Sequence, residues 1–150
     1  MRQVTCRLRT YAFLTILFSM LSPIVFGLSY DEEAETRLQQ RIQHRKPLSV
    51  FDKEAKERML RFLPEEKTSG VLFSSPQLSI DYIRGPDVFQ VEIRTTDLDQ
   101  AKKQAVEWFI GQGFSRDAVC NYPVMFYTSW DVKQSLRNSD IVFSTLAPGC

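Results

Sequence analysis

The sequence predicts an α+β fold: a small four-stranded, largely antiparallel sheet with strands in the order β-β-α-β-β and one helix packed across it. Three observations lead to this prediction. Apolar and polar residues alternate with a period of two over residues 77–95, which is typical of strands with one wet face. The spacing changes to three and four over 98–110, as in an amphipathic helix. Two further apolar runs, 123–129 and 141–145, supply the remaining strands.

The chain opens with the pattern of an export signal. Three arginines within the first nine residues precede an apolar run, residues 11–28, that contains no charged side chain. The small residues Val25 and Gly27 favour cleavage ahead of Leu28, whereas the length of the run and its basic flank fit a retained anchor. Residues 1–28 are therefore predicted to be a signal peptide or a signal anchor. Either one places the rest of the chain outside the cytoplasm, as a secreted or periplasmic protein or as a membrane-anchored one.

Residues 29–64 predict a charged stalk of amphipathic helices. The first segment carries one thin apolar stripe at four-residue spacing, and Pro47 separates it from a second segment that ends at Pro64. Residues 65–76 are polar and rich in turn-forming residues, so they predict a linker with one short strand at most. The compact domain is expected over residues 77–150.

Within that domain, the Gly85-Pro86-Asp87 sequence separates two alternating runs and predicts a β-hairpin. The helix that follows is capped at Thr96 or Asp97, and its small alanines allow it to lie close to the sheet. Glycines end the helix, a short helical turn then leads to the buried strand 123–129, and a polar segment leads to the last strand.

Cys120 and Cys150 are the two cysteines of the predicted exported part. In an oxidising compartment such a pair is expected to form a disulfide. The closed loop of about thirty residues would stabilise the domain by roughly 3–4 kcal/mol. The alternative is two free thiols, with Cys120 as a reactive group. Cys6 lies in the basic flank and is interpreted as incidental, with acylation as the alternative.

Few residues suggest other chemistry. His44 is the single histidine, so a histidine-based triad or a histidine-rich metal site is excluded by count. The carboxylate pairs Glu65-Glu66 and Asp97-Asp99 lie in the predicted linker and at a helix start, where acids are common for structural reasons. No glycine motif for phosphates or dinucleotides is present, and no cofactor is expected. The net charge of +1, with acids and bases interleaved, argues against a nucleic-acid partner.

The run 123–129 is apolar on both of its predicted faces. Met125 and Tyr127 fall on the face that a small sheet usually exposes, and Trp130 follows them. These three residues predict a surface for an unknown protein partner, unless the helices of residues 31–63 cover it.

The leading hypothesis is an exported or membrane-anchored, non-catalytic interaction domain. One alternative is an enzyme of the cell envelope, either a carboxylate hydrolase or a thiol oxidoreductase that uses Cys120. Another alternative is a secreted inhibitor or effector that presents residues 131–140 to its target. The sequence also leaves a membrane partner open, through the N-terminal segment if that segment is retained.

Overall fold

A computed structural model describes residues 28–150, so the predicted signal peptide or anchor lies outside the described residues apart from Leu28. The helices and strands follow in the order β1 (Ser29–Tyr30), α1 (Glu32–Gln43), α2 (Val50–Leu60), β2 (Ser69–Ser74), β3 (Leu78–Ile83), β4 (Val88–Ile93), α3 (Leu98–Gly111), α4 (Arg116–Asn121), β5 (Val124–Thr128), α5 (Trp130–Ser135) and β6 (Val142–Phe143). Within residues 28–150, no helix is both long enough and apolar enough to cross a lipid bilayer.

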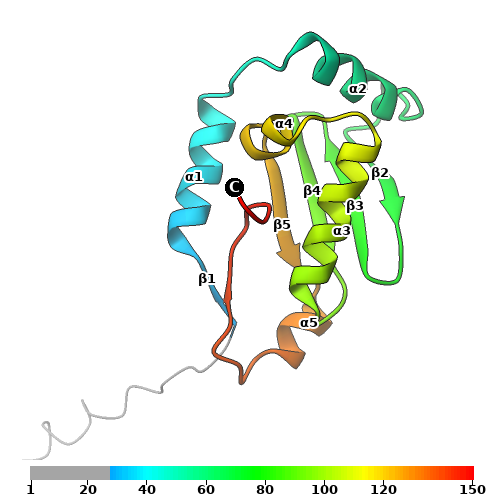
Figure 1. Cartoon of the computed structure of the whole chain (residues 1–150). Coiled ribbons are helices and arrows are strands. Elements are labelled where there is room, and N and C mark those ends of the chain that lie inside the picture. The colour runs from blue at the N-terminus through cyan, green and yellow to red at the C-terminus, as the bar shows by residue number, and fades with distance from the viewer. Residues whose placement is uncertain (1–27) are drawn as a thin grey trace, which may run out of the picture.

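The α+β class is confirmed, and so is the hairpin. Strands β3 and β4 pair antiparallel, with Leu78 opposite Ile93 and Ile83 opposite Val88. Helix α3 lies across one face of the sheet (Figure 1) and buries Ala105 there. Because alanine is small, the helix backbone can approach the strands closely.

The prediction of a largely antiparallel sheet is only partly right. The four-stranded sheet has the order β2-β3-β4-β5, and its β4–β5 pair is parallel. After β4 the chain crosses the sheet through α3 and α4 before it re-enters as β5, and a helical crossover of this kind returns a strand in the parallel direction.

The fourth strand of this sheet is not the expected run 141–145. Its place is taken by β2, from the segment predicted as a linker, which pairs antiparallel with β3. The C-terminal run reaches the outer edge of β5, where the Phe126 N–H donates to the Thr145 carbonyl at 2.9 Å. Its two-residue strand β6 pairs instead with β1, in parallel, with Ser29 opposite Val142.

Helices α1 and α2, expected as a stalk, lie against the body of the molecule (Figure 1). Ala55 and Met59 of α2 belong to the main hydrophobic core. The thin stripe of α1 packs Ala34 and Leu38 against Leu146 of the C-terminal segment in a second, smaller cluster. The apolar residues that the sequence distributes sparsely along this segment therefore find partners in the domain.

Candidate binding site

Four side chains from separate parts of the chain converge on the carboxylate of Asp87. Its Oδ1 accepts hydrogen bonds from Lys56 Nζ, at 2.5 Å, and from the hydroxyls of Tyr82 and Tyr122. Its Oδ2 accepts from Arg45 Nη1, which makes an ion pair. We call Arg45, Lys56, Tyr82, Asp87 and Tyr122 the Asp87 cluster.

The backbone presents Asp87 at the end of the β3–β4 turn. Its φ of 55° lies in the left-handed region, where a short polar side chain is tolerated better than most. The turn closes with the Asp87 N–H donating to the Arg84 carbonyl at 3.1 Å. Arg45 also donates to the Pro86 carbonyl at 2.6 Å, so the loop after α1 is fastened to this turn.

The environment of Asp87 holds its carboxylate in the charged form. Burial disfavours the charge, but hydrogen bonds from Lys56, Tyr122 and Tyr82 outweigh burial and lower the pKa of Asp87. Burial and the same carboxylate raise the pKa of both tyrosines, which stay protonated as donors. Arg45 and Lys56 lie over the Tyr122 ring, 5.3 and 5.1 Å from its centre.

A pocket of about 390 Å³ opens over the Asp87 cluster, between α2 and the loop that follows α1. Its lining is Arg45, Lys46, Pro47, Leu48, Lys53, Lys56, Asp87 and Tyr122. Two further pockets adjoin it, and Lys46 lines all three. The pocket over the Asp87 cluster and one of its neighbours have an excess of cationic side chains, whereas the other neighbour is lined by Lys46 together with Asp52 and Asp117.

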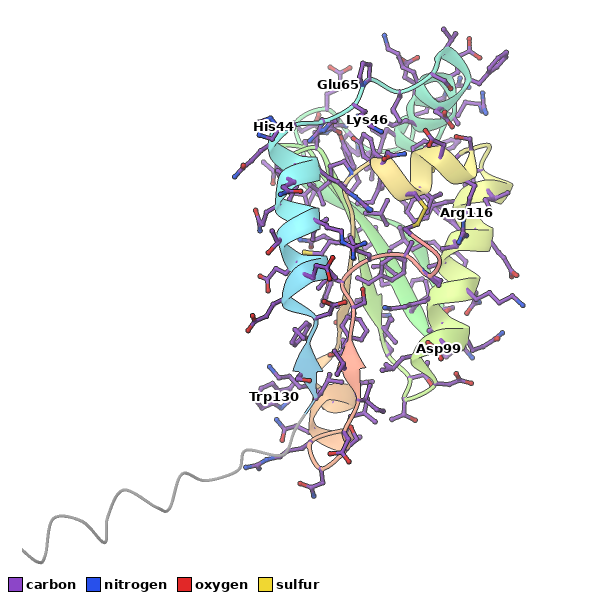
Figure 2. The ribbon with its side chains drawn as sticks, turned by 60° about the vertical axis from the view of Figure 1, so that its left-hand side comes forward. His44, Lys46, Glu65, Asp99, Arg116 and Trp130 are labelled. Carbon is purple, nitrogen blue, oxygen red and sulfur yellow. A yellow bond between two sulfur atoms is a disulfide. The ribbon has the colours of Figure 1, made fainter. Side chains whose placement is uncertain are left out.

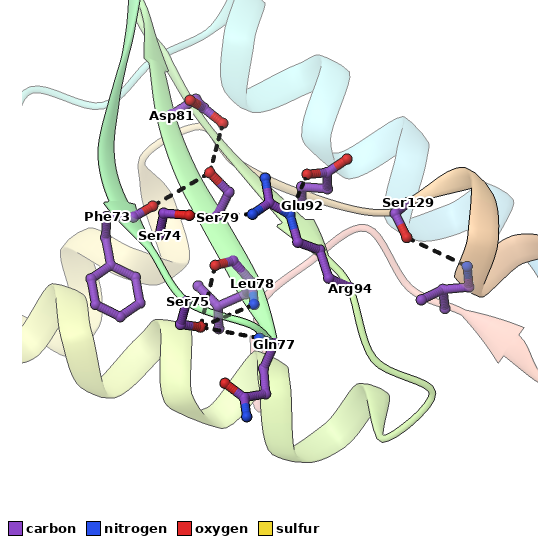
Figure 3. A network of polar contacts seen from close by, with 11 residues as sticks. Phe73, Ser74, Ser75, Gln77, Leu78, Ser79, Asp81, Glu92, Arg94 and Ser129 are labelled. Atoms are coloured by element: carbon purple, nitrogen blue, oxygen red, sulfur yellow. Dashed lines mark hydrogen bonds and ion pairs between the residues drawn. The ribbon is translucent and has the colours of Figure 1, made fainter.

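The outward face of the sheet carries a second set of polar contacts (Figure 3). The hydroxyl of Ser79 lies 3.4 Å from Asp81 Oδ2, and Arg94 pairs with Glu92 at 2.7 Å. Burial raises the pKa of Asp81, and repulsion from Glu92 adds to the rise. Glu92 forms an ion pair with Arg94, whereas Asp81 forms no ion pair among residues 28–150.

The three residues of the predicted partner surface do not form one patch. Met125 is half-buried and packs against the cluster that contains Leu38 of α1. Tyr127 is half-buried on the outward sheet face, in register with Glu92. Trp130 begins α5 and is 71% exposed. Its side chain lies at the end of the molecule opposite His44 and Lys46 (Figure 2).

The structure brings Cys120 and Cys150 together at disulfide-bonding distance, with sulfur atoms 2.00 Å and Cα atoms 5.2 Å apart. The pair joins α4 to the C-terminal segment, and both side chains are half-buried. In this state neither sulfur is a thiolate, which is the form that thiol chemistry requires.

The other residues that the sequence singled out have structural positions. His44 caps the C-terminus of α1, and its backbone N–H donates to the Gln40 carbonyl. Asp97 caps α3 by accepting from the Gln100 N–H at 3.2 Å, and Asp99 lies in the first turn of that helix. Within residues 28–150, no group of three or more histidine, cysteine or carboxylate side chains is placed to hold a metal ion.

One buried charge was not anticipated. Lys102 of α3 is only 7% exposed and lines a cavity of about 600 Å³. Its Nζ donates to the Ser144 carbonyl and lies 4.4 Å from the centre of the Phe143 ring. Burial lowers the pKa of Lys102, against the opposing influence of Asp99 and Asp31. Through these contacts, Lys102 attaches the C-terminal segment to α3.

Comparison of the chain with protein-family models, with curated proteins and with solved structures finds no match.

Proposed function

We propose that this chain is an exported domain that acts by binding a partner, without catalysis, while it is held at the outer face of a membrane or after its release. The observation that carries the proposal is an exposed apolar end at the point where the chain enters the fold. Trp130 and Val142 are 71% and 65% exposed there, and Ile141 is 38% exposed.

The geometry of β1 connects this apolar end to the N-terminal segment. The apolar run 11–28 is followed directly by Ser29, which is already paired with Val142. Tyr30 next to it contacts α5, with Lys133 Nζ 5.8 Å from its ring centre. A retained run would therefore hold this end against the bilayer with no spacer between them. Tryptophan is enriched at membrane–water interfaces, which suits such a position.

The cysteine pair supports export independently of the leader. Disulfides persist in secreted proteins and in the periplasm and are rare in the cytosol, where thiols are kept reduced. The joined residues, Cys120 and Cys150, secure the C-terminal segment of a domain that is small enough to benefit from a covalent link.

The test is the intact mass of the full chain from its native host, alkylated before and after reduction, together with fractionation of the cells. We expect the cysteines to label only after reduction and the domain to be digested by protease added outside the cytoplasmic membrane. The mass shows whether residues before Leu28 are retained. A cytoplasmic chain whose Cys120 and Cys150 label without reductant would overturn the proposal.

A thiol oxidoreductase of the envelope is the second candidate. It is favoured by the fact that both paired cysteines are only half-buried, so a substrate thiol has a route to them. Stopped-flow reduction by a small dithiol separates the two functions, since an oxidoreductase exchanges rapidly at neutral pH and a structural disulfide resists reduction.

A further inference from the structure

We propose that the pocket over the Asp87 cluster binds a tetrahedral oxyanion. This oxyanion is a phosphate or sulfate group carried by the partner of this domain. The inference rests on the proposed function in that it names the chemical class which the binding domain recognises. It does not depend on whether the N-terminal segment is retained.

The first argument is the balance of charge in the pocket. Its lining has four cationic side chains, Arg45, Lys46, Lys53 and Lys56, and a single carboxylate, Asp87. That leaves an excess of three positive charges. Among the residues that the structure describes, neither Lys46 nor Lys53 forms an ion pair. Charges that line a concave surface reinforce one another and attract an anion of high charge density.

The carboxylate of Asp87 is already held by four donors. Oδ1 accepts from Lys56 and two tyrosine hydroxyls, and Oδ2 accepts from Arg45, so few acceptor positions remain. It therefore offers an incoming cation little, while it holds two cations in place. Because Arg45 and Lys56 are also packed over the Tyr122 ring, their orientation is fixed before a ligand arrives. Fixed donors lose less conformational freedom on binding than mobile ones.

The second argument is a set of unused donors beside the pocket. Arg41 Nη1 and Arg45 Nε are buried and have no hydrogen-bond acceptor among residues 28–150. Leaving such a donor unsatisfied is destabilising, and buried groups of this kind call for an acceptor such as water or an ion. Burial and the charge of Arg37 also lower the pKa of Arg41. A nearby anion would relieve this repulsion.

The neighbouring pocket extends the site. It measures about 550 Å³, shares Lys46, and has no carboxylate in its lining of Arg37, Gln40, Arg41, Gln43, His44, Lys46 and Asn121. Arg37 pairs with Glu33 at 2.7 Å, so the cations that remain for a ligand are Arg41 and Lys46. Two cationic pockets joined at one lysine suit a ligand with more than one oxyanion group.

The chemistry of the donors favours phosphate or sulfate over a carboxylate. A tetrahedral oxyanion presents three oxygens to donors arriving from several directions. Lys46 and Lys53 reach a ligand as flexible point charges and the guanidinium groups as planar forks, both of which phosphate-binding sites use. The pocket lies beside His44 and Lys46, at the end of the molecule opposite Trp130 (Figure 2). A ligand can therefore reach it while the apolar end is occupied.

The experiment is calorimetric titration of the full chain, in a neutral detergent and at low ionic strength, with tripolyphosphate, inorganic phosphate, inorganic sulfate and citrate. We expect saturable binding of tripolyphosphate, weaker binding of the single anions, and the weakest binding of citrate, which carries more charge than inorganic phosphate or sulfate but carries it on carboxylates. A difference in affinity between phosphate and sulfate identifies which of the two groups is preferred. Binding of citrate as tight as that of inorganic phosphate and sulfate would overturn the assignment to tetrahedral oxyanions.

Variants locate the binding. Lys46→Glu with Lys53→Glu should weaken tripolyphosphate binding at least tenfold. Both side chains are exposed and make no side-chain hydrogen bond within residues 28–150, so the fold should be retained. Lys103→Glu with Lys133→Glu makes the same change of net charge elsewhere and should alter the affinity less than twofold. Equal weakening by both pairs, or no saturable binding at all, would refute the site.

The two proposals fail separately. A chain that is found outside the cytoplasm but binds none of these anions refutes the oxyanion site alone. A chain that binds tripolyphosphate but remains in the cytoplasm with free thiols refutes export alone.

Discussion

Replacing Asp87 with asparagine tests whether the Asp87 cluster holds the molecule together. The amide keeps one carbonyl oxygen as an acceptor, but it loses the charge and presents an NH₂ group where Arg45 donates. Lys56 and Arg45 are then left as partly buried cations without a counter-charge, at 17% and 28% exposure. The left-handed backbone at this position is tolerated equally well by asparagine, so the change isolates the charge.

The magnitude follows from the contacts. Hydrogen bonds to a charged group contribute about 1.5–3 kcal/mol each, and the amide oxygen of Asp87→Asn can retain two of the four donors as weaker, neutral-acceptor bonds. Water reaches the site, since the Asp87 side chain is 28% exposed, and recovers part of the loss. We therefore expect the free energy of unfolding to fall by about 2–4 kcal/mol.

The assay is equilibrium unfolding in guanidinium chloride at several pH values. The pKa of Asp87 is lower in the folded chain than in the unfolded chain. Its contribution is therefore complete above about pH 4 and is lost as the pH falls through the folded value. The variant should lack this part of the acid sensitivity. Asp140→Asn, an exposed control, should change the free energy by less than about 0.5 kcal/mol. Equal stability of the two variants at pH 7 would refute the reasoning.

Three further changes should have separable effects. Reduction of the Cys120–Cys150 pair, which spans 30 residues, should lower the free energy of unfolding by roughly 3–4 kcal/mol, as measured by thermal unfolding with and without reductant. Asp52→Asn should cost about 2–3 kcal/mol at pH 7, because this buried carboxylate accepts from the Ser115 N–H at 2.7 Å and from its hydroxyl at 3.1 Å. Its pKa is lowered by these bonds and by Ser49, which outweigh burial, so the loss should shrink below about pH 4. Burial lowers the pKa of Lys102, so the contribution of Lys102 to stability should become more favourable as the pH approaches about 10.4. The free energy of unfolding of Lys102→Met should therefore fall more steeply over this range than that of the wild type in denaturant titrations.

Each of these predictions has a contradicting result. An unchanged melting temperature on reduction would show that the cysteine link contributes nothing to stability. For Asp52→Asn, a loss that persists unchanged at pH 3 would contradict the role of the charge. Lys103→Met is the exposed control for Lys102→Met, and a pH dependence that survives in both variants would assign it to other groups.

Local patterns in the sequence predict those elements whose partners lie nearby in the chain. The hairpin forms because its two strands are adjacent and alternate in the same phase, and α3 follows from its apolar spacing. The direction of β5 depends on the route taken by α3 and α4, which no local pattern records. Likewise β2 lies in a segment of turn-forming residues, and its place in the sheet depends on pairing with β3.

The candidate site could not be predicted for a related reason. Asp87 is recognisable only as a turn residue, because the partners of its carboxylate lie 42, 31, 5 and 35 residues away in the sequence. The nearest of them, Tyr82, looks like an ordinary inward-facing strand residue. The one available sign was the grouping of basic residues around Pro47, which is equally typical of a solvated loop.

The C-terminal segment has a consequence for the order of events during synthesis. It provides β6 for β1, the carbonyl that receives Lys102, and the sulfur that joins Cys120. Each of these contacts links residues 141–150 to a part of the chain that is made before them. The nascent polypeptide therefore cannot close its fold until residues 141–150 have left the ribosome. Until then β1, the first element after the apolar run, has no strand to pair with, and the second sheet of the fold cannot form.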